Sequence, residues 1–243
     1  MLQAFALGAI AQASLLLSGL LPYAVRIPDR IVGILAGIGA GALLGAVAFD
    51  LVPEAITAAE VALWFLVGAV IFIVADKIIE ARFGDSGENE GSETEGGSED
   101  DGSPLGIVLG SVVDGVPESV IFGIQLAAGI SISVAFLAAV FISNIPQAVA
   151  PSAALVRQGW RPGRMIAMWG AVVIACGVAS AAGWIVATNV DNVTGARTAA
   201  IAAGAVLAML TASLVPFAYQ KGGAGAALGT VVGFCGALMG SAT

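Results

Sequence analysis

Two acidic residues one helical turn apart, inside a long apolar segment, are the part of this sequence best suited to chemistry. Asp114 and Glu118 are spaced i, i+4, so both lie on one face of a helix, and Ser111 and Gln125 extend that polar face. Pro117 has no N–H, so the carbonyl four residues before it loses its helical partner. Carboxylates, neutral oxygens and a free carbonyl are ligands that hard cations prefer. The pattern therefore predicts a cation site.

The next apolar segment repeats this arrangement with neutral residues. Ser143 and Gln147 are again spaced i, i+4, Asn144 is adjacent, and Pro146 frees another carbonyl. If the two helices face each other, their oxygens form one cage. A structural kink held by interhelical hydrogen bonds, or a proton relay, would also explain such residues within lipid. The predicted metal ligands are Asp114, Glu118, Ser143, Asn144 and Gln147.

Few other residues in the sequence could take part in chemistry. Asp50 and Glu54 flank Pro53 near the end of a predicted helix, where they indicate either an entrance site or a polar cap at the interface. Cys176 and Cys235 stand alone in apolar runs, which indicates packing residues rather than a disulfide or a thiolate site. The sequence contains no histidine, the commonest transition-metal ligand.

The composition requires a membrane around these residues. The chain has 243 residues, of which 58% are hydrophobic and 11% are charged, whereas soluble domains average about 25% charged residues. At roughly 20 residues per crossing, residues 1–243 form a single all-α transmembrane domain of eight helices. These helices are predicted at about 2–24, 31–57, 60–82, 104–129, 132–158, 162–188, 194–220 and 222–241.

Charge predicts how these helices are oriented. With eight crossings, eight of the nine Lys and Arg residues fall on one face, and Arg197 alone falls on the other. Positive residues favour the cytoplasmic side, which places both termini outside the cell membrane. Residues 84–103 are rich in Gly, Ser and acids and contain no apolar residue, so we expect a disordered cytoplasmic loop.

Two internal similarities indicate an inverted repeat. The segment 41–55 aligns without a gap with 204–218, proline on proline, and 114–119 aligns with 143–148. In the predicted topology the members of each pair run in opposite directions. Secondary transporters are often built from such repeats, and the two pairs nest about one centre in a 3+2+3 order of helices.

The order of helices, the long cytoplasmic loop and the paired proline motifs resemble the ZIP (Zrt/Irt-like) metal transporters over nearly the whole chain. That family carries His-Asn-x-Pro-Glu-Gly on its fourth helix. Here Asp114 stands at the histidine position, while Pro117 and Glu118 match. The resemblance implies a divalent-cation carrier, not an enzyme and not a nucleic-acid binder. It also implies a homodimer and an elevator-like motion of helices 1, 4, 5 and 6 against 2, 3, 7 and 8.

The chain departs from the family at several ligands. On the fifth helix Asn144 matches, Ser143 stands at a histidine, and Gln147 replaces a bridging glutamate. Ser180 corresponds to a further glutamate on the sixth helix. Without nitrogen or sulfur ligands, Mg²⁺, Mn²⁺ or Ca²⁺ fits at least as well as Zn²⁺. These losses equally fit a divergent paralogue that moves no metal and acts as a membrane scaffold or sensor, or carries another solute. Asp50, Glu54, Ser111, Gln125 and Ser180 are predicted as additional residues of a transport path.

Overall fold

The described residues form helices joined by short connections, with no strand among them. The structure, a computed structural model, describes residues 1–52, 56–83, 104–129, 134–190 and 192–241. The predicted acidic loop at 84–103 and Glu54 lie outside these ranges. The helices are α1 (Leu2–Leu20), α2 (Asp29–Phe49), α3 (Ala58–Phe83), α4 (Pro104–Ala127), α5 (Val134–Arg157), α6 (Pro162–Asn189), α7 (Asn192–Met209), α8 (Val215–Gly222) and α9 (Ala224–Ser241). A 3₁₀ turn, η1 (Leu21–Tyr23), extends α1, and a π-helical turn, η2 (Leu210–Leu214), joins α7 to α8.

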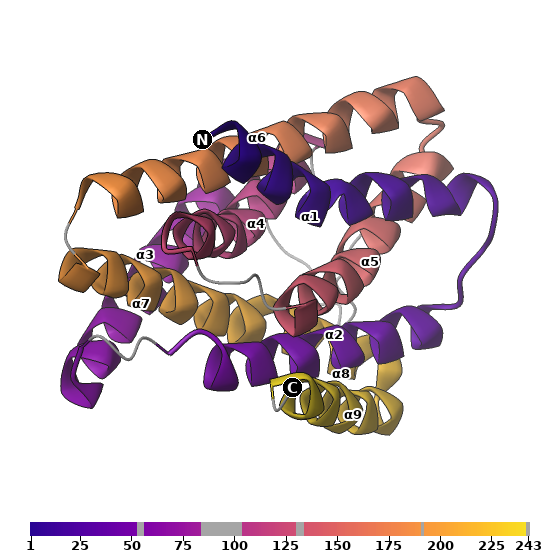
Figure 1. The fold of residues 1–243 in the computed structure, drawn as a ribbon. Helices are drawn as coiled ribbons and strands as arrows, with labels where there is room; N and C mark the ends of the chain where they lie inside the picture. Colours follow the sequence, from indigo (N-terminus) through magenta and orange to yellow (C-terminus); the bar gives the residue numbers. More distant parts are fainter. Residues whose placement is uncertain (53–55, 84–103, 130–133, 191, 242–243) are drawn as a thin grey trace.

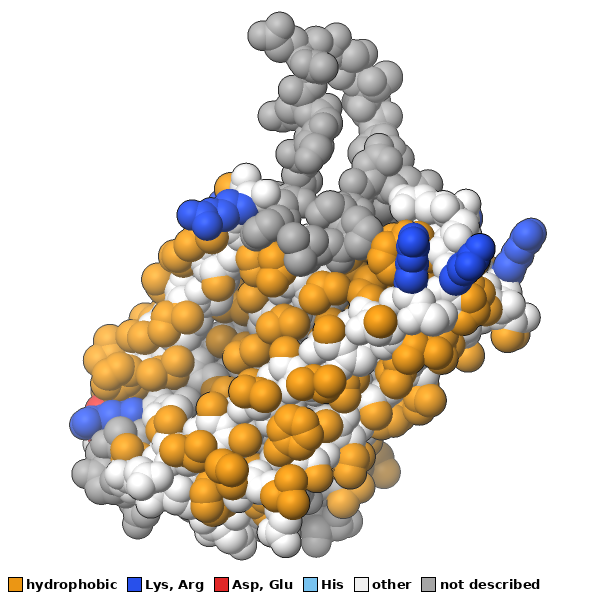
Figure 2. Space-filling model, turned by 90° about the horizontal axis from the view of Figure 1, so that it is seen from above, with side chains coloured by type: hydrophobic (Ala, Val, Ile, Leu, Met, Phe, Trp, Pro, Cys, Tyr) orange, Lys and Arg blue, Asp and Glu red, His pale blue; other side chains and the backbone are white. Residues whose placement is uncertain are grey.

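The helices are those of a multi-pass membrane protein. Seven helical segments of the described chain are long and apolar enough to cross a bilayer, and Ala224–Gly240 is a shorter apolar helix. Large apolar side chains are exposed within the helices, including Leu66 at 65% and Val232 at 56%. Figure 2 shows hydrophobic side chains spread along the face in view, with Lys and Arg side chains confined to its ends. In water such a surface would be unstable, so the prediction of an all-α integral membrane protein is confirmed.

Figure 1 shows how the helices pack side by side. α1 lies beside α6 and α5, and α4 packs on α6. α2 packs on α9 and α8, and α3 packs on α7. α5 packs more extensively on α2 than on α1, and α7 contacts α4. Where α5 meets α2, Gly39 lies against the backbone of Ser143.

Glycines allow α2 and α9 to approach backbone to backbone. Gly33, Gly37, Gly41 and Gly45 recur every fourth residue along α2, and the first three of them lie directly against backbone atoms of α8 or α9. A Cβ on Gly41 would collide with the carbonyl oxygen of Thr230. Small residues at this spacing are typical of tightly packed transmembrane helices.

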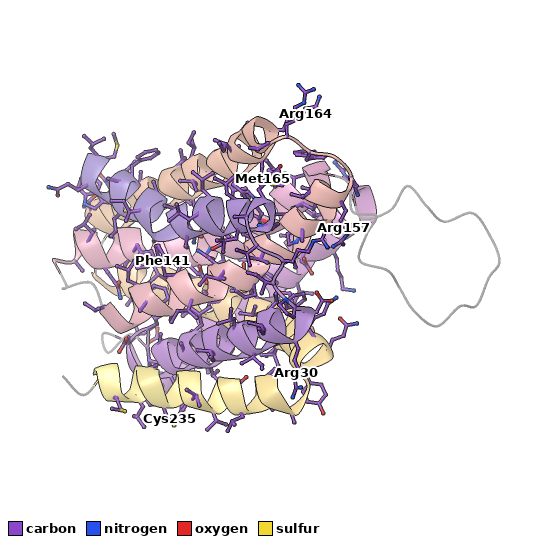
Figure 3. The ribbon with its side chains drawn as sticks, turned by 90° about the vertical axis from the view of Figure 1, so that its right-hand side faces the viewer. Arg30, Phe141, Arg157, Arg164, Met165 and Cys235 are labelled. Atoms are coloured by element: carbon purple, nitrogen blue, oxygen red, sulfur yellow. The ribbon has the colours of Figure 1, made fainter. Side chains whose placement is uncertain are left out.

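Arginine side chains lie near the ends of the helices. Arg30, Arg157 and Arg164 lie at the same end (Figure 3), in agreement with the predicted grouping of basic residues. Arg197, near the start of α7, pairs with a residue of another helix. Its Nη2 lies 2.9 Å from Glu60 Oε1 at the start of α3. Both side chains of that pair are more than one third exposed, so solvent screening leaves the ion pair little weight in stability.

Two expected helix features differ from the structure. The helix predicted over 31–57 begins at Asp29 and already ends at Phe49, and Asp50 lies in a turn. The segment aligned with it, 204–218, remains helical through Pro216. Because proline cannot donate to the carbonyl of the preceding turn, the π-helical turn just before Pro216 absorbs the disruption. Pro216 therefore does not end its helical segment, whereas the aligned helix α2 ends at Phe49. The two aligned segments thus differ over their described residues.

Candidate functional site

Glu118 is the buried centre of the candidate site. It lies near the middle of α4, where Pro117 is accommodated inside a continuous helix. Only 1% of Glu118 is exposed. Its Oε2 accepts a hydrogen bond, whereas its Oε1 is buried without a hydrogen-bond partner. A buried acid with one free oxygen is costly in an apolar surrounding, so this position is a candidate binding site for a proton or a cation.

Gln12 of α1 connects Glu118 to α5. The amide Nε2 of Gln12 donates to Glu118 Oε2 at 3.1 Å, and its Oε1 accepts from Asn144 Nδ2 at 2.8 Å. Asn144 also donates to Ser14 Oγ at 2.9 Å. All four side chains are buried. We call this set, Ser14, Asn144, Gln12 and Glu118, the polar chain; it joins three helices through neutral donors that end on one acid.

The direct α4–α5 cage expected from the sequence is replaced by this indirect link. α4 and α5 make little contact with each other, because α4 packs mainly on α6, and α5 mainly on α2 and α1. Gln12 occupies the position between Glu118 and Asn144. The two proline-containing helices are therefore not pressed together, and a residue from α1 supplies the contact that was expected between them.

Asp114 lies one turn before Glu118 and is half-buried. It is close enough to Asp76 of α3 to interact electrostatically with it, and close enough to Glu118 to do the same. The sequence pattern does not single out Asp76. The structure brings this carboxylate into the neighbourhood of Asp114, so α3 and α4 each contribute an acid to this part of the bundle.

The α5 residues differ in their environments. Ser143 is fully buried, and its Oγ donates to the carbonyl of Val140 at 2.9 Å, within the same helix. Asn144 belongs to the polar chain. Gln147 is half-buried. Of the three predicted α5 ligands, the structure thus connects only Asn144 to Glu118 by the hydrogen bonds of the polar chain.

The other predicted path residues are scattered along the bundle. Gln125 and Ser180 are buried, and each has a side-chain oxygen without a hydrogen-bond partner. Ser111 is half-buried on α4. Asp50 lies in the turn after α2 rather than on a helix, so its position relative to Pro53 differs from the expected acid-proline-acid helix end. Glu54 lies outside the described residues.

A sulfur atom lies beside the candidate site. Cys176 of α6 is fully buried, and a Cβ on Gly115 of α4 would meet its Sγ at 2.7 Å. The same Cβ would lie 3.5 Å from Gln12 Nε2. Ser119 lies within hydrogen-bonding reach of the Cys176 thiol, and Glu118 is close enough to interact electrostatically with it. Cys176 was predicted to be a packing residue, and it does belong to a buried apolar cluster with Met165 and Trp169. The proximity of its sulfur to the acids was not expected.

Gln12 and Asp76 are the functional candidates that sequence reasoning missed. Gln12 carries the signal that singled out Asp114, a polar side chain within an otherwise apolar helix, but it has no acidic or proline neighbour. Asp76 has a lysine directly after it, which made an interfacial role plausible. Both signals were present, and only the arrangement of helices distinguishes them from ordinary polar residues.

The described residues contain no cluster of three or more His, Cys, Asp or Glu side chains arranged to hold a metal ion. The chemistry available around Glu118 is instead one carboxylate, amide groups, hydroxyls and one thiol. Such a set can bind a proton or a single cation within the membrane.

The sequence matches no protein-family model, and no curated protein is significantly similar to it. The resemblance to ZIP transporters therefore stays a prediction.

Proposed function

We propose that this protein is a ZIP-like secondary transporter that carries a divalent cation across the plasma membrane by alternating access. The observation that carries the proposal is Glu118: a carboxylate 1% exposed, in mid-helix, with one oxygen held by Gln12 and the other without a partner. An ionised acid at the bilayer centre costs about 2.5–3.5 kcal/mol even on insertion scales. A binding role accounts for that cost, and a purely structural role does not.

The arrangement of apolar helices supports a carrier. Seven spans and one shorter apolar helix fit eight crossings in a 3+2+3 order. The arginines at one end of the bundle fit a cytoplasmic face under the positive-inside rule, with both termini outside. By the resemblance to ZIP transporters, α1, α4, α5 and α6 would move against the other helices within a homodimer, and α5 would then slide along its extensive contact with α2.

The cargo would bind where Glu118 and Asp114 approach each other on α4. These acids supply charge, and the neighbouring amides and hydroxyls supply neutral oxygens. Asp76 adds negative charge on the side of Asp114. A cation that moves into this region replaces part of its hydration shell with these oxygens, and the excess negative charge favours a divalent ion over a monovalent one.

The decisive experiment measures cation uptake into proteoliposomes. The native chain is compared with Glu118→Gln and Asp114→Asn for Mg²⁺, Mn²⁺, Ca²⁺, Zn²⁺ and Cd²⁺. We expect the native chain to take up at least one ion saturably. In both variants the uptake should fall by roughly 10–100-fold, the loss that removal of a metal-site partner causes. Glu60→Gln is the matched control, because it removes an exposed acid from the same protein. Equal uptake by the native chain and both site variants would exclude this site.

A second function, a membrane scaffold or sensor that moves no metal, is favoured by one observation. Within the described residues no three potential ligands of the His, Cys, Asp and Glu types converge, and hydrogen bonds already occupy much of the polar chain. The same uptake experiment separates the two functions. Absence of uptake for all five ions, with correctly folded protein in the vesicles, would replace the transporter with this second function.

A further inference from the structure

Arginine residues gather where the end of α1 meets the turn between α5 and α6. Arg26 follows η1, and Arg161 and Arg164 lie at the start of α6. All three are exposed, and the ion pairs between described residues include none of them. The next acid along the chain after Arg26, Asp29, has its Oδ2 3.5 Å from Lys221 Nζ of α8. The three arginines, which we call the arginine patch, therefore present positive charge that no acid of the described chain pairs with.

The packing of α1 on α6 brings the two parts of the arginine patch together. Gly8, in the first half of α1, lies against Ser180 of α6. Gly19, near the end of α1, lies against the indole ring of Trp169. The two helices therefore run antiparallel, since α1 meets lower-numbered residues of α6 as it proceeds. In this register the chain that follows α1 lies beside the first turn of α6.

A hydrogen bond between two aromatic residues fixes this meeting point. The hydroxyl of Tyr23 donates to the backbone carbonyl of Trp160 at 2.8 Å. Arg26 comes three residues after Tyr23, so their Cα atoms are at most about 11 Å apart. Arg161 directly follows Trp160, and Figure 3 shows the Arg164 side chain extending from this end of the bundle. The arginine patch is therefore one surface, built from two segments that are hydrogen-bonded to each other.

Apolar side chains are exposed directly beside the arginine patch. Val25, which precedes Arg26, is 57% exposed, and Ile166, two residues after Arg164, is 47% exposed. Membrane proteins place Tyr and Trp side chains, such as the hydrogen-bonded pair between these arginines, at the level of the lipid headgroups. The surface thus offers cations and apolar contacts side by side at the membrane interface. A phospholipid with an anionic headgroup has the matching chemistry, because it joins a negative charge to acyl chains.

We propose that the arginine patch binds the headgroup of an anionic phospholipid, whose acyl chains lie along the exposed apolar side chains beside it. A guanidinium group binds phosphate oxygens through two parallel N–H donors, so the three arginines can hold one headgroup together. In the predicted orientation this end of the bundle faces the cytoplasmic leaflet, where anionic lipids are concentrated. The inference is independent of the cation site at Glu118. A lipid bound here would anchor the junction of α1 and α6 at the membrane interface, whatever the protein carries.

Native mass spectrometry of the full-length protein, in detergent micelles with added lipid, measures how tightly lipid molecules bind. Phosphatidylglycerol and phosphatidylcholine are the probes, because both carry a phosphate and only phosphatidylglycerol has a net negative charge. Each arginine beside an anionic lipid strengthens binding by about fivefold, so the first phosphatidylglycerol should bind roughly 100-fold more tightly than phosphatidylcholine. Arg26→Gln, Arg161→Gln and Arg164→Gln should each weaken phosphatidylglycerol binding by about fivefold and leave phosphatidylcholine binding unchanged.

Arg82→Gln is the matched control. Arg82 is also exposed, but it lies at the end of α3, a helix that packs on α7 and α4. The substitution removes the same charge and should leave both lipid affinities unchanged. Size-exclusion profiles report whether each variant is folded.

Four outcomes would overturn the proposal. Equal affinity for the two lipids would exclude a headgroup site, and equal weakening by Arg82→Gln and the patch variants would mean that net charge alone attracts lipid. Displacement of phosphatidylglycerol by excess inorganic phosphate would make the patch a site for free phosphate. A preference for phosphatidylglycerol that appears only after the acids of residues 84–103 are replaced by glutamine would make that acidic segment the occupant.

Discussion

Replacement of Gln12 by leucine is expected to destabilise the folded protein by about 2–4 kcal/mol, because a buried acid then loses its partner. Gln12 is fully buried, donates to Glu118 Oε2 and accepts from Asn144. After the substitution neither oxygen of Glu118 would keep a hydrogen bond of the polar chain. Unfolding of the purified protein in mixed micelles, driven by a denaturing detergent and followed by circular dichroism, measures the change.

Ser14→Ala is the matched control on the same helix. It removes one hydrogen bond from Asn144, which retains its bond to Gln12. Ordinary interhelical hydrogen bonds in membranes contribute only about 0.6 kcal/mol on average, so this variant should be several times milder. If Gln12→Leu is no more harmful than Ser14→Ala, Gln12 does not support the acid.

A double variant sharpens this prediction. When both partners of a buried hydrogen bond become apolar, the loss is far smaller than when one partner is left alone. Gln12→Leu combined with Glu118→Leu should therefore be less destabilised than the sum of the single variants, by about 0.5–3 kcal/mol. Additive effects would mean that Gln12 and Glu118 do not interact.

The substitution Gly41→Ala is expected to have the second large effect. A methyl group at this position would collide with the carbonyl oxygen of Thr230, an atom of the α9 backbone that cannot rotate away. α2 and α9 must separate to admit it, and overpacking of this kind costs about 1–3 kcal/mol. The measurement is again the free energy of unfolding in mixed micelles.

Gly236→Ala tests whether the contact, rather than glycine itself, is responsible. Gly236 belongs to α9 as well, but a Cβ there would meet no atom within 4 Å. In a helix, alanine is preferred over glycine by about 0.5–1 kcal/mol, so this control should be neutral or slightly more stable. A loss of stability in Gly236→Ala equal to that in Gly41→Ala would contradict close α2–α9 packing as the cause.

Composition predicted the class of fold because lipid imposes one rule on every span. Long apolar segments must be helical to satisfy their backbone groups, which is why the bounds of α4 and α6 agree with prediction within about two residues. The end of α2 was not predictable in this way. The apolar pattern continues past Phe49, and the alignment with 204–218 favoured a continuous helix.

The candidate site was predictable only in part, since its acids carry a local signal and its partners do not. Asp114, Pro117 and Glu118 stand together in the sequence, and their spacing alone places both acids on one face of α4. Gln12 lies 106 residues before Glu118, and Cys176 lies on a helix further along the chain. Which helix contacts α4 near Glu118 depends on how the whole bundle packs. No local sequence pattern contains that information.

The contact of α2 with α5 has a mechanical consequence. Gly39 presents bare backbone to Ser143, so at this point neither helix inserts a bulky knob into a hole of the other. Translation along a smooth contact requires no side chain to be lifted out and reseated. In the proposed carrier, α5 would slide along α2 at this contact, whereas the hydrogen-bonded residues around Gln12 would move as one rigid unit.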